Sequence, residues 1–124
     1  MDNNRPKFLD LRQIRLPLPG LVSILHRVSG ALLFLALPLL LWMLQQSLRS
    51  HETYSDLAGV LRYPAVKIFL LIISWAFLHH FCAGVRFLAI DADAGVRLGQ
   101  ARASGKWVLA VSLALSLLLG VRLW

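Results

Sequence analysis

Residues 28–48 read VSGALLFLALPLLLWMLQQSL, a run of 21 residues without a charged side chain. As an α-helix, this run is long enough to cross the hydrocarbon core of a bilayer, which takes about 20 mostly apolar residues. Two further runs carry no formal charge, residues 68–85 and residues 107–121. The last run is short, but Arg122 and Trp124 can extend it into the interface. The sequence therefore predicts three membrane-spanning helices.

Composition supports the same fold class. The chain has 124 residues, of which 58% are hydrophobic, and its mean hydropathy is +0.68. A soluble domain of this length cannot bury so much apolar surface, so we expect an all-α integral membrane protein without a soluble domain. The expected segments are an N-terminal stretch 1–20, a first span 21–48, an outer loop 49–63 with a possible short helix, a second span 64–91, an inner loop 92–105 and a third span 106–124.

The net charge of +7 does not indicate nucleic-acid binding, because the basic residues flank the apolar runs instead of forming one soluble face. Nine lie on one side of the membrane and four on the other. The positive-inside rule therefore places the N-terminus in the cytoplasm, or in the matrix of a mitochondrion, and the C-terminus outside. The nine are Arg5, Lys7, Arg12, Arg15, Arg27, Arg86, Arg97, Arg102 and Lys106, and the four are Arg49, Arg62, Lys67 and Arg122.

Polar residues stand at the mouth of the first span, in the run 23–30, SILHRVSG. At about 100° per residue, Ser23, His26, Arg27 and Gly30 share one arc of the helix. They are either interfacial anchors or part of a site, and their spacing favours a site. For Arg27 the simple alternative is a cation that reaches the interface.

Two adjacent histidines lie inside the second span, where ionisable groups are costly unless they are paired or liganded. His80 shares its side of the helix with small residues, Ala83 and Gly84, which leave room for a flat, bulky group such as a haem. The alternative is a histidine hydrogen-bonded to a neighbouring helix. The predicted topology puts His80 and His26 in the same leaflet. We expect His79 to pack against a partner or to reach the interface.

Several of these motifs resemble the cytochrome b subunit of succinate dehydrogenase, the larger membrane anchor of respiratory complex II. The N-terminal part carries Arg5-Pro6, Leu9-Asp10-Leu11 and Ile14-Arg15-Leu16-Pro17, followed by the run 23–30. The second span carries a His, three residues, Gly, one residue and Arg, then an apolar stretch to Asp, which here runs from His80 to Asp91. The resemblance covers almost the whole chain.

The resemblance implies roles for four residues. His80 would be one axial ligand of a haem b that is shared with the small anchor subunit. Ser23 and Arg27 would line a ubiquinone site, and His26 with Arg27 would lie near the haem propionates. Many relatives have a second His where this chain has Phe87, so any role of that position in haem binding is absent here.

The implied function is that of a non-flavin electron-transfer subunit of a quinone-reducing succinate dehydrogenase in the bacterial inner membrane. The chain has no flavin site and a single cysteine, Cys82, so we expect a flavoprotein and an iron–sulfur subunit as partners, and we assign no catalytic residue to this chain. The alternatives are an anchor of a fumarate reductase, a structural anchor without haem and, from another class, a small membrane transporter. A transporter favours internal pseudo-symmetry, which the three dissimilar spans do not show.

Overall fold

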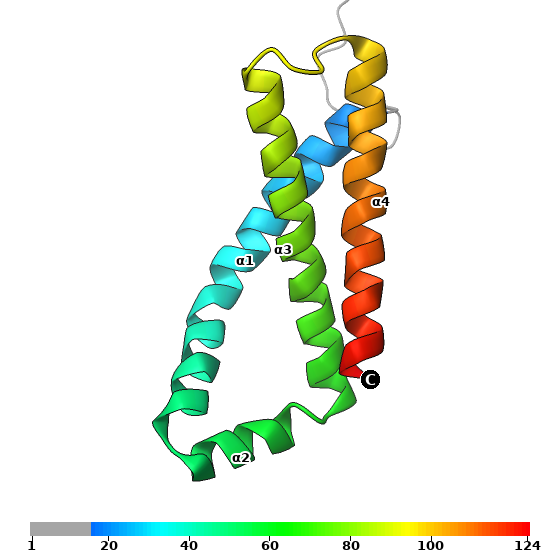
Figure 1. The fold of residues 1–124 in the computed structure, drawn as a ribbon. Helices are drawn as coiled ribbons and strands as arrows, with labels where there is room; N and C mark the ends of the chain where they lie inside the picture. The colour runs from blue at the N-terminus through cyan, green and yellow to red at the C-terminus, as the bar shows by residue number, and fades with distance from the viewer. Residues whose placement is uncertain (1–15) are drawn as a thin grey trace, which may run out of the picture.

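The structure is a computed structural model that describes residues 16–124. It contains four helices in this part of the chain (Figure 1), and these are α1 (Leu18–Arg49), α2 (His51–Val60), α3 (Pro64–Asp91) and α4 (Leu98–Leu123). Helices α1, α3 and α4 are each long and apolar enough to cross a membrane. The all-α, three-span fold class that the sequence predicts is therefore confirmed, whereas the orientation of the termini stays a prediction.

The helices form an open arrangement around α3, which packs against both α1 and α4. Helix α4 lies alongside α3, whereas α1 crosses α3 near the N-terminal end of α1 and then diverges from it (Figure 1). The short helix α2 bridges the diverging ends. Because α2 joins them as a hairpin, α1 and α3 run antiparallel.

The helix starts follow from local chemistry. Proline lies in the first turn of both α1 and α3, where its fixed φ suits a helix and its missing N–H removes no internal hydrogen bond. Helix α2 begins with a capping box, in which the Ser50 hydroxyl accepts from the Thr53 N–H and the Thr53 hydroxyl accepts from the Ser50 N–H.

Two helix boundaries differ from the sequence expectation. Helix α1 starts at Leu18, so Pro19 and Gly20 lie within its first turn. Helix α4 starts at Leu98, inside the expected inner loop 92–105. Hydropathy detects only the apolar part of a helix. Residues 99–105 are polar or small, but they contain no proline that would stop helix formation.

Most of the buried residues on the three spans are small or polar. The buried side chains of α3 recur every three or four positions, as expected for one face of a helix. Small residues allow helices to approach closely in a membrane, where apolar side chains gain little by facing protein instead of lipid. The buried residues are Val22, Ser29 and Ala36 of α1, Ile73, Ala76, His79, Ala83 and Arg86 of α3, and Gly105, Val108, Ser112 and Ser116 of α4.

Candidate functional site

The ring of His26 on α1 stacks on the ring of His80 on α3. Their centroids are 4.1 Å apart, and the ring planes differ by 7°. The two residues lie 54 positions apart in the chain, and both are partly buried. The structure therefore brings together the two histidines that the sequence analysis selected on separate helices.

Each ring lies over a glycine of the opposite helix. A Cβ atom on Gly30 would lie 2.8 Å from Cε1 of His80, and a Cβ atom on Gly84 would lie 3.6 Å from Nε2 of His26. The first distance is too short for a side chain, whereas the second is an ordinary contact. Gly30 is thus the position at which α1 makes room for the imidazole of α3.

This reciprocal arrangement has a simple origin in the sequence. Both helices carry His followed four positions later by Gly, as His26 and Gly30 on α1 and as His80 and Gly84 on α3. Residues four apart lie one turn apart on the same face. Because α1 and α3 are antiparallel, the histidine of each helix meets the glycine of the other. The sequence analysis did not use this shared spacing, which is the signal that could have indicated a contact between the two helices at these positions.

Hydrogen bonds hold one nitrogen of the His80 ring. Nδ1 lies 3.0 Å from the backbone carbonyl oxygen of His26 and 3.3 Å from the hydroxyl oxygen of Ser29. The Ser29 hydroxyl also donates to the same carbonyl, at 2.9 Å. A carbonyl oxygen only accepts, so Nδ1 carries the proton in this hydrogen bond. The neutral ring then has its lone pair on Nε2, where it is available to a ligand.

Ser23 and Arg27 lie on α1 within one turn of His26, but the structure does not bring their side chains onto His80. Ser23 is partly buried and Arg27 is exposed. Within residues 16–124 neither side chain forms a hydrogen bond or an ion pair. Ser29, which the sequence analysis did not select, is fully buried and contacts the His80 ring directly.

His79 lies inside the bundle, which differs from its expected place at a partner or at the interface. Its side chain is fully buried and stacks on Trp75, with 5.3 Å between the ring centroids. Neither ring nitrogen has a hydrogen-bond partner within the described residues. His79 belongs to the same buried face of α3 as Arg86, whose guanidinium donates to the Ser104 hydroxyl at 2.9 Å and to the Ala101 carbonyl at 3.1 Å.

Comparison with known proteins identifies the family. Residues 1–119 match the family model of the succinate dehydrogenase/fumarate reductase transmembrane subunit. The chain is 34% identical to the succinate dehydrogenase cytochrome b556 subunit of Coxiella burnetii over the full length of both proteins. Subunits of the same name from Rickettsia felis and Paracoccus denitrificans are each 33% identical, over 96% and 93% of this chain and over 93% and 88% of the relatives.

The chain belongs to this family. It is a membrane-anchor subunit of the succinate dehydrogenase cytochrome b type, and the resemblance seen in the motifs is confirmed. Membership also means that it functions together with other subunits of such a complex.

Phe87 brings an aromatic ring to the crossing of α1 and α3 in this succinate dehydrogenase anchor. Phe87 meets the His26 ring edge to face, with 5.2 Å between centroids, and it lies 5.3 Å from the Arg86 guanidinium. Phe87 thus packs against the site from the cytoplasmic side of the predicted topology. It offers no nitrogen, so the polar groups at this crossing come from α1 and from His80.

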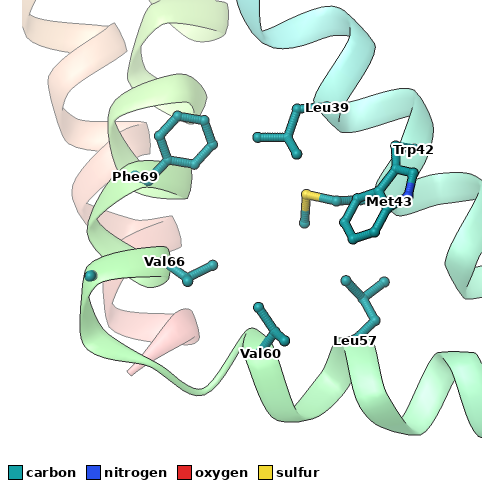
Figure 2. Close-up of a pocket in the computed structure, with 8 residues that line it drawn as sticks. Leu39, Trp42, Met43, Leu57, Val60, Val66 and Phe69 are labelled. Atoms are coloured by element: carbon teal, nitrogen blue, oxygen red, sulfur yellow. The ribbon is translucent and has the colours of Figure 1, made fainter.

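The anchor also contains an apolar pocket of about 290 Å³ between α1, α2 and α3 (Figure 2). It lies at the end of the bundle that α2 closes, away from the crossing of α1 and α3. None of the predicted site residues lines it. The lining residues are Leu39, Trp42, Met43, Leu57, Val60, Ala65, Val66 and Phe69.

Proposed function

We propose that this chain is the cytochrome b anchor of a succinate:ubiquinone oxidoreductase, with His80 as an axial ligand of haem b. The observation that carries the proposal is the state of the His80 ring. Its Nδ1–H is held by the His26 carbonyl, which leaves the Nε2 lone pair for a metal. Histidines that bind metals commonly donate their other ring N–H to such an acceptor, which sets the tautomer and the ring orientation.

The donor set fits a haem better than a bare metal ion. Within residues 16–124 no three His, Cys, Asp or Glu side chains lie close enough to hold an ion. A porphyrin brings four nitrogen ligands of its own and requires only axial ligands from protein. One imidazole from this chain is therefore sufficient if the small anchor subunit supplies the second axial ligand.

Gly30 supports the same proposal. The His80 ring occupies the space that a side chain at position 30 would fill. His26 stacks on this ring, and Arg27 follows it in the sequence of α1. Both would attract the haem propionates, because a protonated guanidinium and an imidazole N–H both donate to carboxylates. When bound, haem b supplies one-electron transfer between the iron–sulfur subunit and quinone.

Ser23 and Arg27 are proposed to form this chain's part of the ubiquinone site. The Arg27 guanidinium is exposed, and the Ser23 hydroxyl lies one turn away on the same arc of α1. The hydroxyl would donate to a quinone carbonyl oxygen. The guanidinium would stabilise the negative charge that develops on that oxygen during reduction. An anchor of a fumarate reductase would use the same parts with a quinone of lower potential. The potential of the bound quinone therefore tests whether the complex oxidises succinate or reduces fumarate.

The remaining walls of both sites are proposed to come from partner chains. The chain's own residues offer the imidazoles of His26 and His80, the Ser23 hydroxyl and the Arg27 guanidinium, and the chain has a single cysteine, which cannot hold an iron–sulfur centre. We therefore propose the small anchor subunit, the iron–sulfur subunit and the flavoprotein as partners. The location that follows is the bacterial inner membrane, with the site in the cytoplasmic leaflet.

An absorption spectrum of the purified complex tests the haem assignment. Dithionite-reduced minus oxidised spectra are recorded for the unaltered complex, for His80→Ala and for the control His51→Ala, which changes an exposed residue of α2. We expect the b-type bands to be lost or shifted in His80→Ala and unchanged in the control. An unchanged spectrum in His80→Ala would overturn the proposal. Succinate oxidation with an artificial dye shows whether each complex has assembled.

A further inference from the structure

The crossing of α1 and α3 is asymmetric at one position. The matching His and Gly residues are related by the antiparallel packing, but the residue before each glycine differs, Ser29 on α1 and Ala83 on α3. Only α1 therefore presents a hydroxyl to the opposite histidine. Both residues are fully buried, so this difference lies inside the helix contact and not on a surface.

The Ser29 hydroxyl and the His26 carbonyl form a pair of acceptors around one proton. Nδ1 of His80 lies 3.0 Å from the carbonyl oxygen and 3.3 Å from the hydroxyl oxygen. The hydroxyl donates its own proton to the carbonyl at 2.9 Å, which turns a lone pair of Ser29 toward Nδ1. A ring held by two acceptors has less freedom to rotate than a ring held by one.

We infer that Ser29 and Gly30 are positioning residues for the haem ligand. Gly30 admits the His80 ring to the surface of α1, and Ser29 completes the acceptor pair that holds the Nδ1–H. The inference rests on the proposed role of His80. Both residues contact the His80 ring and would act on the haem only through it.

The two residues have different physical effects. Acceptors on Nδ1–H raise the electron-donating power of Nε2, which stabilises ferric over ferrous iron. Removing the Ser29 hydroxyl therefore raises the midpoint potential of the haem and loosens the ring orientation. A methyl group at position 30 would lie 2.8 Å from Cε1, so the ring or the helix has to move and the ligand geometry is lost.

The test measures the haem itself in the purified complex. In Ser29→Ala we expect a full complement of haem, a higher midpoint potential and a broader low-spin ferric electron paramagnetic resonance signal. The matched control is Ser112→Ala, because Ser112 is equally buried and its hydroxyl donates only to Leu109 of its own helix. Ser29→Thr, which keeps the hydroxyl, is expected to restore the potential toward that of the unaltered complex.

Gly30→Ala is compared with Gly59→Ala, a helical glycine whose added Cβ meets open space. We expect loss of haem or a shifted spectrum only at position 30. If Gly30→Ala prevents assembly, the haem midpoint potential of the Ser29→Ala complex alone decides whether the inference stands. Haem parameters unchanged in Ser29→Ala would overturn the inference while leaving the function intact. A complex without any b-type spectrum before mutation would instead overturn the proposed function.

Discussion

Polar residues of α1 divide into two groups according to what they face. His26 and Ser29 turn toward α3 and engage the His80 ring, whereas Arg27 is exposed to the surroundings of the chain. A guanidinium at the edge of a bilayer either reaches the interface or meets an anionic partner. Ser23, one turn before Arg27, places a hydroxyl beside it. This pairing of a neutral donor with a cation suits an oxygen that becomes negative during a reaction.

Alanine substitutions test the quinone assignment at this scale. We expect Arg27→Ala to lower quinone reduction about 100-fold, the order seen when one preorganised donor to a developing negative charge is removed. Ser23→Ala is expected to have a smaller effect, because it removes a neutral donor. Both rates are measured with succinate and a soluble ubiquinone analogue.

Dye-coupled succinate oxidation serves as the control for these two variants, because it does not use the quinone site. It is expected to persist in both. Parallel loss of the two activities would mean failed assembly and would contradict a specific role in quinone binding. Arg27→Lys, which keeps the charge without the planar fork, is expected to recover part of the rate.

Among the elements, α3 and α4 are joined by a buried cation. Arg86 is 7% exposed and donates to the Ser104 hydroxyl and the Ala101 carbonyl, both in the polar first turns of α4. Both acceptors lie on the part of α4 that precedes its apolar run, which begins at Trp107. They give a physical reason why α4 extends beyond its apolar run: its first turns provide acceptors for a charge that has left water.

Ser104→Ala is expected to destabilise the assembly by about 1–3 kcal/mol, because it leaves a buried donor of Arg86 without its partner. The thermal unfolding midpoint of the purified complex in detergent measures this loss. Ser116→Ala is the matched variant, since Ser116 is also buried in α4 but donates within its own helix. Equal midpoints for the two variants would show that the hydrogen bond from Arg86 to the Ser104 hydroxyl does not stabilise the assembly.

For the whole molecule, the described chain does not enclose its own site. Large apolar side chains face outward along the spans, as in Phe34, which is 75% exposed, and Leu35, which is 74% exposed. Apolar side chains can face lipid without an energetic penalty. The partly buried His26 and His80 rings, however, carry polar atoms that are costly to leave in lipid. The crossing of α1 and α3 therefore needs cover from outside residues 16–124, and we expect another protein chain or a bound group to provide it.

Expression of this chain alone is expected to yield aggregated or degraded protein. Without partner subunits, the polar crossing of α1 and α3 and the outer faces of the helices stay exposed. Co-expression with the other three proposed subunits is expected to give a single assembled species. Size-exclusion chromatography in detergent distinguishes the two outcomes. A stable, monodisperse and helical monomer from the isolated chain would contradict the expectation.

The sequence alone determined the three spans, the family and the choice of His26 and His80, because hydropathy, charge and motif spacing are local properties of the chain. The N-terminal motifs at positions 5–15 lie outside the described residues. Only the tertiary structure decided that the two histidines stack, that Gly30 makes room for His80 and that Ser29 holds its Nδ1–H. It also placed His79 in the interior and joined Arg86 to α4. These contacts depend on the register between antiparallel helices, which is set by packing between residues far apart in the chain.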